Sequence, residues 1–302
     1  MIADKIYSEQ PIAVTFKSKL RDYKQLIKLR LNTVVVFSTV IGFLIGSTTG
    51  HINWLNLLIV TIGGFLTVGA ANGINQIIEK DSDKLMKRTE NRPVAQNRMS
   101  VNEAGIASFV MGFVGLLLIT LFLNKFSGIL SLSALCIYAF IYTPLKKISP
   151  IAVHVGAISG AIPPIIGYVA ATGRIDAITW ALFIIQFIWQ FPHFYAIAWV
   201  CDDDYKRAGL RMLPLGADKD KKGAWQILLF TLSLLPLSFL PYFMGNTSIF
   251  ACVLVLLCSG LFSYQSIALF RELSDKRARQ LMFGSFLYLP LVFIIILMDK
   301  LI

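Results

Sequence analysis

Nine apolar runs, each long enough to cross a lipid bilayer, dominate this sequence. They lie near residues 32–50, 54–78, 103–123, 127–143, 150–171, 178–200, 224–243, 247–269 and 280–299. A run of roughly 17–25 apolar residues crosses a bilayer as an α-helix, because lipid offers the backbone no hydrogen-bond partner. The chain is 56% hydrophobic and 15% charged, and no soluble segment interrupts the runs. We therefore expect an all-α polytopic membrane protein with a single domain over residues 1–302.

The basic residues are unevenly distributed between the loops. With the N-terminus inside, the N-terminal arm and the loops at 79–102, 144–149, 201–223 and 270–279 lie on one side. They hold all but three of the 28 Lys and Arg residues, and the exceptions are Lys125, Arg174 and Lys300. Lys and Arg concentrate on the cytoplasmic side of membrane proteins. The net charge of +11 therefore indicates orientation, with a cytoplasmic N-terminus, and not nucleic-acid binding.

The N-terminal arm, residues 1–31, ends in a stretch of alternating apolar and basic character. Over residues 16–31, Phe16, Leu20, Tyr23 and Ile27 recur at helical spacing among lysines and arginines. This pattern predicts an amphipathic helix that lies on the inner membrane surface. A solvated basic arm is the alternative.

The second apolar run ends in acidic residues that are followed by arginines. Asn75, Glu79 and Asp83 recur every four residues, which places three oxygen-bearing side chains on one helix face. Oxygen ligands at this spacing suit Mg²⁺, and the arginines that follow, Arg88 and Arg92, suit phosphate oxygens. A helix end neutralised by nearby lysines would explain the charge but not the shared face. We interpret the segment as a site for a metal and a diphosphate ester.

The sixth run ends in a similar cluster, Cys201-Asp202-Asp203-Asp204-Tyr205, with Arg207 and Arg211 beyond it. A diphosphate usually takes more than one Mg²⁺, because each ion uses only one or two carboxylates. Asp203 and Asp204 are the candidate ligands, and a solvated helix end is the alternative. The repetition predicts two four-helix halves plus a ninth helix in one bundle, with the acidic ends facing each other.

Two further elements carry candidate binding groups. Tyr142 and Lys146, at the end of the fourth run, can present a hydroxyl and an ammonium to one phosphate. His193 lies in the sixth run in an aromatic segment that extends to Trp199. An ionisable side chain at that depth is costly without a partner, so His193 is a candidate to contact a metalloporphyrin or to act as a base. A hydrogen-bonded packing histidine is the alternative, and His154 is a weaker candidate of the same kind.

These motifs resemble the UbiA superfamily of intramembrane prenyltransferases. The matching segment is Asn75-x-x-x-Glu79-x-x-x-Asp83 with Met86-Lys-Arg88-Thr89-x-x-Arg92-Pro93. Several features are similar to one branch, the heme O synthases (protoheme IX farnesyltransferases). They are Glu79, Met86-Lys-Arg-Thr89, Pro192-His193-Phe194, Asp203-Asp204-Tyr205 with Met212-Leu-Pro214, Tyr142-x-x-x-Lys146 and Gly160-Ala-x-Pro163-Pro164. The resemblance covers about residues 24 to 295.

The resemblance implies a nine-helix bundle around a central cavity that opens to the cytoplasm. It implies Mg²⁺-dependent transfer of a farnesyl group from farnesyl diphosphate to a vinyl group of protoheme IX, with water addition, giving heme O. The implied location is a bacterial cytoplasmic (inner) membrane, with heme A synthase or a terminal oxidase assembly as partners. The implied residues fall into three sets. The catalytic set is Asn75, Glu79, Asp83, Arg88, Arg92 and Lys146; the metal set is Asn75, Glu79, Asp83, Asp203 and Asp204; the substrate-binding set is Tyr142, His193, Trp199, Asp203, Asp204, Tyr205, Arg207 and Arg211.

Two other functions fit parts of the sequence. An aromatic prenyltransferase acting on a quinone precursor would share the acidic motifs, but Gln76 and Glu79 stand where such relatives typically carry Asp. A transporter would place charged residues near the bilayer midplane, whereas these acids cluster at helix ends beside arginines. The second cluster departs from the Asp-x-x-x-Asp pattern because position 199 is Trp, which leaves its metal ligand open.

Overall fold

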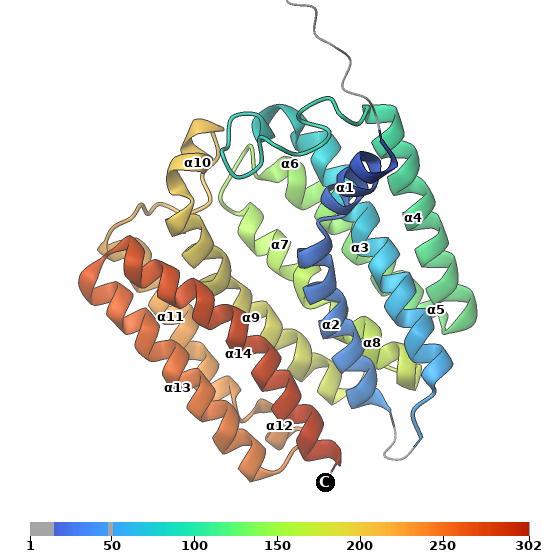
Figure 1. Ribbon diagram of the computed structural model, residues 1–302. Helices are drawn as coiled ribbons and strands as arrows, with labels where there is room; N and C mark the ends of the chain where they lie inside the picture. The colour runs from blue at the N-terminus through green and yellow to red at the C-terminus, as the bar shows by residue number, and fades with distance from the viewer. Residues whose placement is uncertain (1–14, 48–50, 302) are drawn as a thin grey trace, which may run out of the picture.

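The computed structural model describes residues 15–47 and 51–301 (Figure 1). The elements of the N-terminal part are α1 (Phe16–Leu26), α2 (Leu29–Gly46), α3 (Trp54–Asp83), α4 (Val101–Phe122), α5 (Lys125–Cys136), η1 (Ile137–Tyr142), α6 (Thr143–Leu145), α7 (Ala152–Ala161) and α8 (Pro163–Thr172). Those of the C-terminal part are α9 (Ala177–Val200), α10 (Asp202–Arg207), α11 (Lys221–Leu237), α12 (Leu240–Phe243), α13 (Ile249–Glu272) and α14 (Asp275–Leu301).

Within these described residues, nine spans are long and apolar enough to cross a membrane, which confirms the predicted number and the all-α class. Two of the spans are composite. The fourth combines α5, a π-helical turn (η1) and α6, and the fifth changes from α7 to α8 at Ile162. This change occurs directly before Pro163 and Pro164, because proline has no N–H to continue the helical hydrogen bonds.

The long helices pack side by side in one bundle (Figure 1). Helix α3 packs between α2 and α4, α9 packs against α7, α11 and α14, and α13 packs between α11 and α14. Helix α2 packs mainly against α8, and its contact with α14 joins it to the C-terminal helices. The largest fully buried side chains include Tyr195 and Trp199 of α9 and Phe293 of α14, so much of the core lies between these two helices.

Helices α1, α6 and α10 lie at one end of the bundle, which we call the inner end, together with the loop between α3 and α4 (Figure 1). Helix α12 and the C-terminus lie at the opposite, outer end. The basic residues of α1 therefore share an end with the C-terminus of α3 and its acidic residues. Every sequence element that we interpreted as phosphate-binding is at this inner end.

The prediction of a single amphipathic helix over residues 16–31 is wrong in its last turn. Helix α1 ends at Leu26, and Lys28 adopts a left-handed conformation (φ 50°) before α2 begins at Leu29. The side-chain amides of Asn72 and Gln76 on α3 donate hydrogen bonds to the carbonyl groups of residues 25–27. These bonds replace the helical hydrogen bonds at this point. Residues 1–14 of the predicted N-terminal arm lie outside the described residues.

Candidate active site

Asn75, Glu79 and Asp83 lie along one buried face of the last turns of α3. These three residues are at most 5% exposed. Asp81, which the spacing places off this face, is exposed and pairs with Lys84 at 3.4 Å. We call Asn75, Glu79 and Asp83 the acidic stripe.

Cationic side chains contact both carboxylates of the acidic stripe. The Arg92 guanidinium, from the loop after α3, donates to both oxygens of Asp83 at 2.8 and 2.7 Å and lies 3.7 Å from Glu79. The ammonium of Lys146, which follows α6, pairs with Glu79 and lies 4.5 Å from the ring centroid of Tyr142. The structure thus brings the Tyr142–Lys146 motif and Arg92 into contact with the acidic stripe.

The third member of the stripe, Asn75, is oriented by a hydroxyl group. Thr143 donates its single proton to the carbonyl of Tyr138 at 2.8 Å, across the π-helical turn. Its oxygen must therefore accept from Asn75 Nδ2, at 3.1 Å, which turns Asn75 Oδ1 in the other direction. That oxygen accepts a hydrogen bond from Lys28 Nζ at 2.6 Å. Burial, followed by the nearby Arg92 guanidinium, lowers the pKa of Lys28 well below its usual value.

The second acidic cluster meets the loop that follows the acidic stripe. Asp204 of α10 accepts from the backbone N–H of Arg88 at 3.3 Å and pairs with Arg207. The Arg88 guanidinium lies 5.8 Å from the ring centroid of Tyr205, and Arg207 contacts the carbonyl of Leu85 at 3.4 Å. The two repeated motifs are therefore adjacent at the inner end.

Other predicted residues of this cluster are placed differently. Asp203 and Arg211 are exposed, and Asp202 pairs with Lys206 at 2.7 Å. Trp199 is fully buried, and its Nε1 has no hydrogen-bond partner. Among the residues that the structure describes, no group of three or more His, Cys, Asp or Glu side chains is arranged to hold a metal ion. Any metal site here would need the amide oxygen of Asn75 beside the two carboxylates of the stripe.

His193 lies deeper in the bundle, where its ring stacks on Trp189 with centroids 4.5 Å apart. Its Nδ1 is 2.7 Å from the hydroxyl of Ser285 on α14. Ser285 donates its own proton to the carbonyl of Met282 at 2.6 Å, so His193 must donate from Nδ1. The lone pair of the neutral ring is therefore on Nε2, free for a ligand. His154 differs, because its Nδ1 is buried without a partner and its ring packs 4.9 Å from Phe191.

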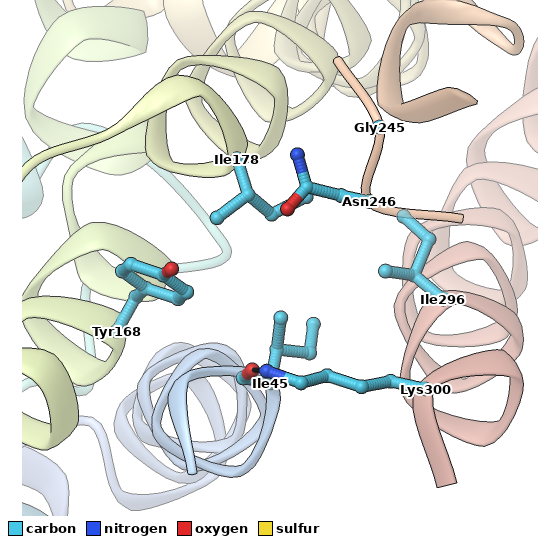
Figure 2. Close-up of a pocket in the computed structure, with 7 residues that line it drawn as sticks. All are labelled: Ile45, Tyr168, Ile178, Gly245, Asn246, Ile296 and Lys300. Carbon is cyan, nitrogen blue, oxygen red and sulfur yellow. Dashed lines mark hydrogen bonds between the residues drawn. The ribbon is translucent and has the colours of Figure 1, made fainter. Parts of the chain in front are cut away.

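A cavity of about 220 Å³ lies far from these residues. Figure 2 shows the residues that line it, which come from α2, α8, α9, α14 and the turn after α12. Lys300 reaches across one side and donates to the carbonyl of Ile45 at the end of α2. Helix α2 is about 27 Å long at 1.5 Å per residue, so this cavity and the acidic stripe lie near opposite ends of the bundle.

Three residues that the sequence analysis missed organise the site: Lys28, Thr143 and Ser285. Lys28 resembles every other lysine of the basic arm. Thr143 lies within the Tyr142–Lys146 motif, which offered the only available signal. Ser285 is a small residue in an apolar run, and nothing in the sequence connects it with His193.

The sequence matches the UbiA prenyltransferase family over residues 35–289. A protein of Cytophaga hutchinsonii named protoheme IX farnesyltransferase is 47% identical over 94% of this chain and 99% of its own length. A protein of Flavobacterium johnsoniae with the same name is 41% identical over 95% of this chain and 97% of its own length.

Solved structures share the fold. A digeranylgeranylglyceryl phosphate synthase is similar with a TM-score of 0.78 and 22% identity, over 94% of this chain and 99% of the other. A UbiA homolog from Archaeoglobus fulgidus, bound to GPP and Mg²⁺, is similar with a TM-score of 0.68 and 17% identity, over 91% and 99%. At these identities the likeness concerns the fold alone.

Proposed function

The chain belongs to the UbiA prenyltransferase family, and we propose that it transfers a farnesyl group from farnesyl diphosphate to a vinyl group of protoheme IX, with water addition, giving heme O and diphosphate. Relatives named protoheme IX farnesyltransferase, which align over nearly the whole chain, support this acceptor. One observation carries the transfer chemistry: the carboxylates of Glu79 and Asp83 are held by the cations of Lys146 and Arg92 at the inner ends of α3 and α6.

The acidic stripe fits Mg²⁺ as the cofactor. Mg²⁺ prefers oxygen ligands, and Asn75, Glu79 and Asp83 offer an amide and two carboxylates on one face. Each of these side chains already contacts a lysine or arginine, so its oxygen faces positive charge. Bound there, Mg²⁺ would neutralise the charge that grows on the leaving diphosphate. Asp204, with Asp203 beside it, is the candidate ligand set from α10.

The cationic residues act on the diphosphate. Arg88, Arg92 and Lys146 take its outer oxygens, where preorganised positive charge stabilises the negative charge of bond cleavage. Tyr142, whose ring lies beneath the Lys146 ammonium, keeps that cation in place. On the other half, Tyr205 lies beside Arg88, and Arg207 and Arg211 extend the positive charge around the diphosphate.

The reaction then balances without a general base. The farnesyl C1–O bond breaks, the electron pair leaves with diphosphate, and C1 bonds to the terminal vinyl carbon. Water adds to the cation formed beside the porphyrin ring and loses a proton to solvent or to diphosphate. The buried aromatic residues of α9, including Trp199, exclude other water from the allylic cation.

His193 is the residue that we assign to protoheme. It lies on α9, ten residues before Asp203 along the chain. Its free Nε2 can ligate iron or accept a hydrogen bond, and the Ser285 hydroxyl keeps this tautomer.

We expect His193→Phe to weaken protoheme binding by at least about tenfold, since one hydrogen bond or iron ligand is lost. Titration of the purified chain with protoheme, followed by the Soret band, measures this affinity. His51→Phe, at an exposed position, is the control and should bind as the parent does. Equal affinity of the His193→Phe protein and the parent would exclude His193 from the heme site.

The most direct test of the proposed function is heme extraction from bacteria that lack their own heme O synthase. Mass analysis should find heme O when this chain is expressed and none when Asp83→Asn is expressed at the same membrane level. Absence of farnesylated heme with the parent chain would exclude the proposed acceptor. In that case, prenylation of aromatic quinone precursors by the same membranes would support the alternative function in this family.

We also propose a single domain over residues 1–302 in the bacterial cytoplasmic membrane, with the inner end and its loops facing the cytoplasm. The distribution of Lys and Arg supports this orientation, because 25 of the 28 lie in the N-terminal arm and the loops assigned to that side. Heme A synthase or a terminal oxidase assembly would take up the product.

A further inference from the structure

Lys28 has an unusual backbone conformation at the junction of α1 and α2. Its φ and ψ of 50° and 57° are left-handed, although the residue is not glycine. For a residue with a Cβ this conformation costs roughly 1–2 kcal/mol, and it persists where the surroundings enforce it. The contacts around this junction show what enforces it.

Two side-chain amides of α3 form hydrogen bonds with the backbone just before Lys28. Asn72 Nδ2 donates to the carbonyl of Ile27 at 3.1 Å. Gln76 Nε2 donates to the carbonyls of Gln25 and Leu26 at 2.7 and 3.0 Å. The carbonyl of Gln25 also accepts from the backbone N–H of Lys28 at 3.1 Å. The α3 amides therefore satisfy carbonyl groups at the end of α1 and fix the direction in which the chain continues.

The same junction is anchored to the loop that follows the acidic stripe. Leu26 is fully buried in a cluster with Val94 and Met99 of that loop. Asp22 pairs with Arg98 at 3.0 Å. Helix α1 is therefore attached to the phosphate-binding loop and is not merely a surface helix.

The result of this arrangement is an ammonium group inside the site. Lys28 Nζ contacts the neutral Asn75 Oδ1, while the two stripe carboxylates pair with Arg92 and Lys146. Among the ion pairs of the described residues, none includes Lys28. Because Lys28 has only an amide partner here, an anion beside it would stabilise the charged form of its side chain.

We propose that Lys28 is a diphosphate-binding residue, whose ammonium moves from Asn75 Oδ1 to a diphosphate oxygen when Mg²⁺ occupies the acidic stripe. The inference rests on the proposed function and adds a fourth cation, from the junction of α1 and α2, to Arg88, Arg92 and Lys146. When Asn75 Oδ1 binds a metal ion, it no longer accepts the hydrogen bond from Lys28 Nζ. The release of the ammonium therefore couples metal binding to diphosphate binding.

The test is binding of inorganic diphosphate with Mg²⁺ to the purified full-length chain, measured by isothermal titration calorimetry. Lys28→Gln keeps a donor for Asn75 but removes the charge, and we expect about 10- to 100-fold weaker binding. Lys24→Gln removes an exposed charge from α1, four residues before Lys28, and should bind as the parent does. Lys28→Arg should recover most of the affinity. Unchanged affinity of the Lys28→Gln protein would overturn the proposal.

A second measurement needs no variant and applies even if Lys28→Gln does not fold. Amine-reactive labelling of the parent, read by peptide mass spectrometry, should slow at Lys28 when Mg²⁺ and diphosphate are present and stay constant at Lys24. A labelling rate at Lys28 that is the same with and without diphosphate would contradict the proposal. Loss of protoheme binding with intact diphosphate binding in the Lys28→Gln protein would also overturn it, and would assign the ammonium to a propionate.

These outcomes are separable from those of the proposed function. If the parent makes no heme O but Lys28→Gln weakens diphosphate binding, the acceptor is wrong and the role of Lys28 stands. If the parent makes heme O and Lys28→Gln binds diphosphate normally, only the inference about Lys28 fails.

Discussion

Replacing Glu79 by Gln is expected to lower the rate of farnesyl transfer by about 10²- to 10³-fold, the usual effect of removing one preorganised group that stabilises transition-state charge. Glu79 is 5% exposed and contacts two cations of the site, Lys146 and Arg92. The amide cannot hold these cations or a metal ion as a carboxylate does. The rate should be measured with saturating protoheme and farnesyl diphosphate in detergent-solubilised protein.

Asp81→Asn is the matched control for this prediction. It removes a carboxylate from the same helix two residues away, but the Asp81 side chain is 74% exposed and pairs only with Lys84 among the described residues. Its activity should stay within about twofold of the parent, as is usual for an exposed ion pair. Equal losses in both variants would mean that the general charge of this helix end matters and not the stripe.

The effect on catalysis can be separated from an effect on stability. Glu79→Gln leaves the ammonium of Lys146 without its carboxylate, which costs roughly 3–5 kcal/mol when the pair is buried. Lys146→Met combined with Glu79→Gln removes both charges, so thermal stability should recover while activity stays lost. Recovery of activity in the double variant would show that the pair is structural.

The spans and the acidic stripe could be predicted from the sequence because each depends only on the residue pattern within one segment. Lipid requires long apolar helices, so hydropathy alone locates the nine spans. The period of the helix places Asn75, Glu79 and Asp83 on one face wherever α3 lies in the bundle.

Contacts between distant segments could not be predicted in the same way. Thr143 meets Asn75 across 68 residues, and Ser285 meets His193 across 92. Which face of α10 points toward Arg88 also depends on tertiary contacts. Successive residues on a helix point about 100° apart, so three consecutive aspartates do not reveal that Asp204 meets Arg88 while Asp203 is exposed.

Helices α2 and α8 pack so closely that alanine at Gly42 or Gly167 is expected to destabilise the protein strongly. A Cβ at Gly167 would lie 1.8 Å from the carbonyl oxygen of Thr39, and a Cβ at Gly42 would lie 2.0 Å from that of Pro164. Both obstructing atoms belong to backbone, so no side-chain rotation relieves the clash. The two helices must separate, and overpacking of this kind costs about 1–3 kcal/mol or more per site.

Gly260→Ala is the matched control, because that glycine is exposed on α13 and a Cβ there meets no atom within 4 Å. Thermal unfolding in detergent should give a midpoint about 5–10 °C lower for Gly42→Ala combined with Gly167→Ala. The control should unfold at or slightly above the parent temperature, since alanine favours the helix. Since α2 also follows directly from Lys28, separating it from α8 should weaken diphosphate binding. A double variant as stable as the parent would show that the helices do not pack at this distance.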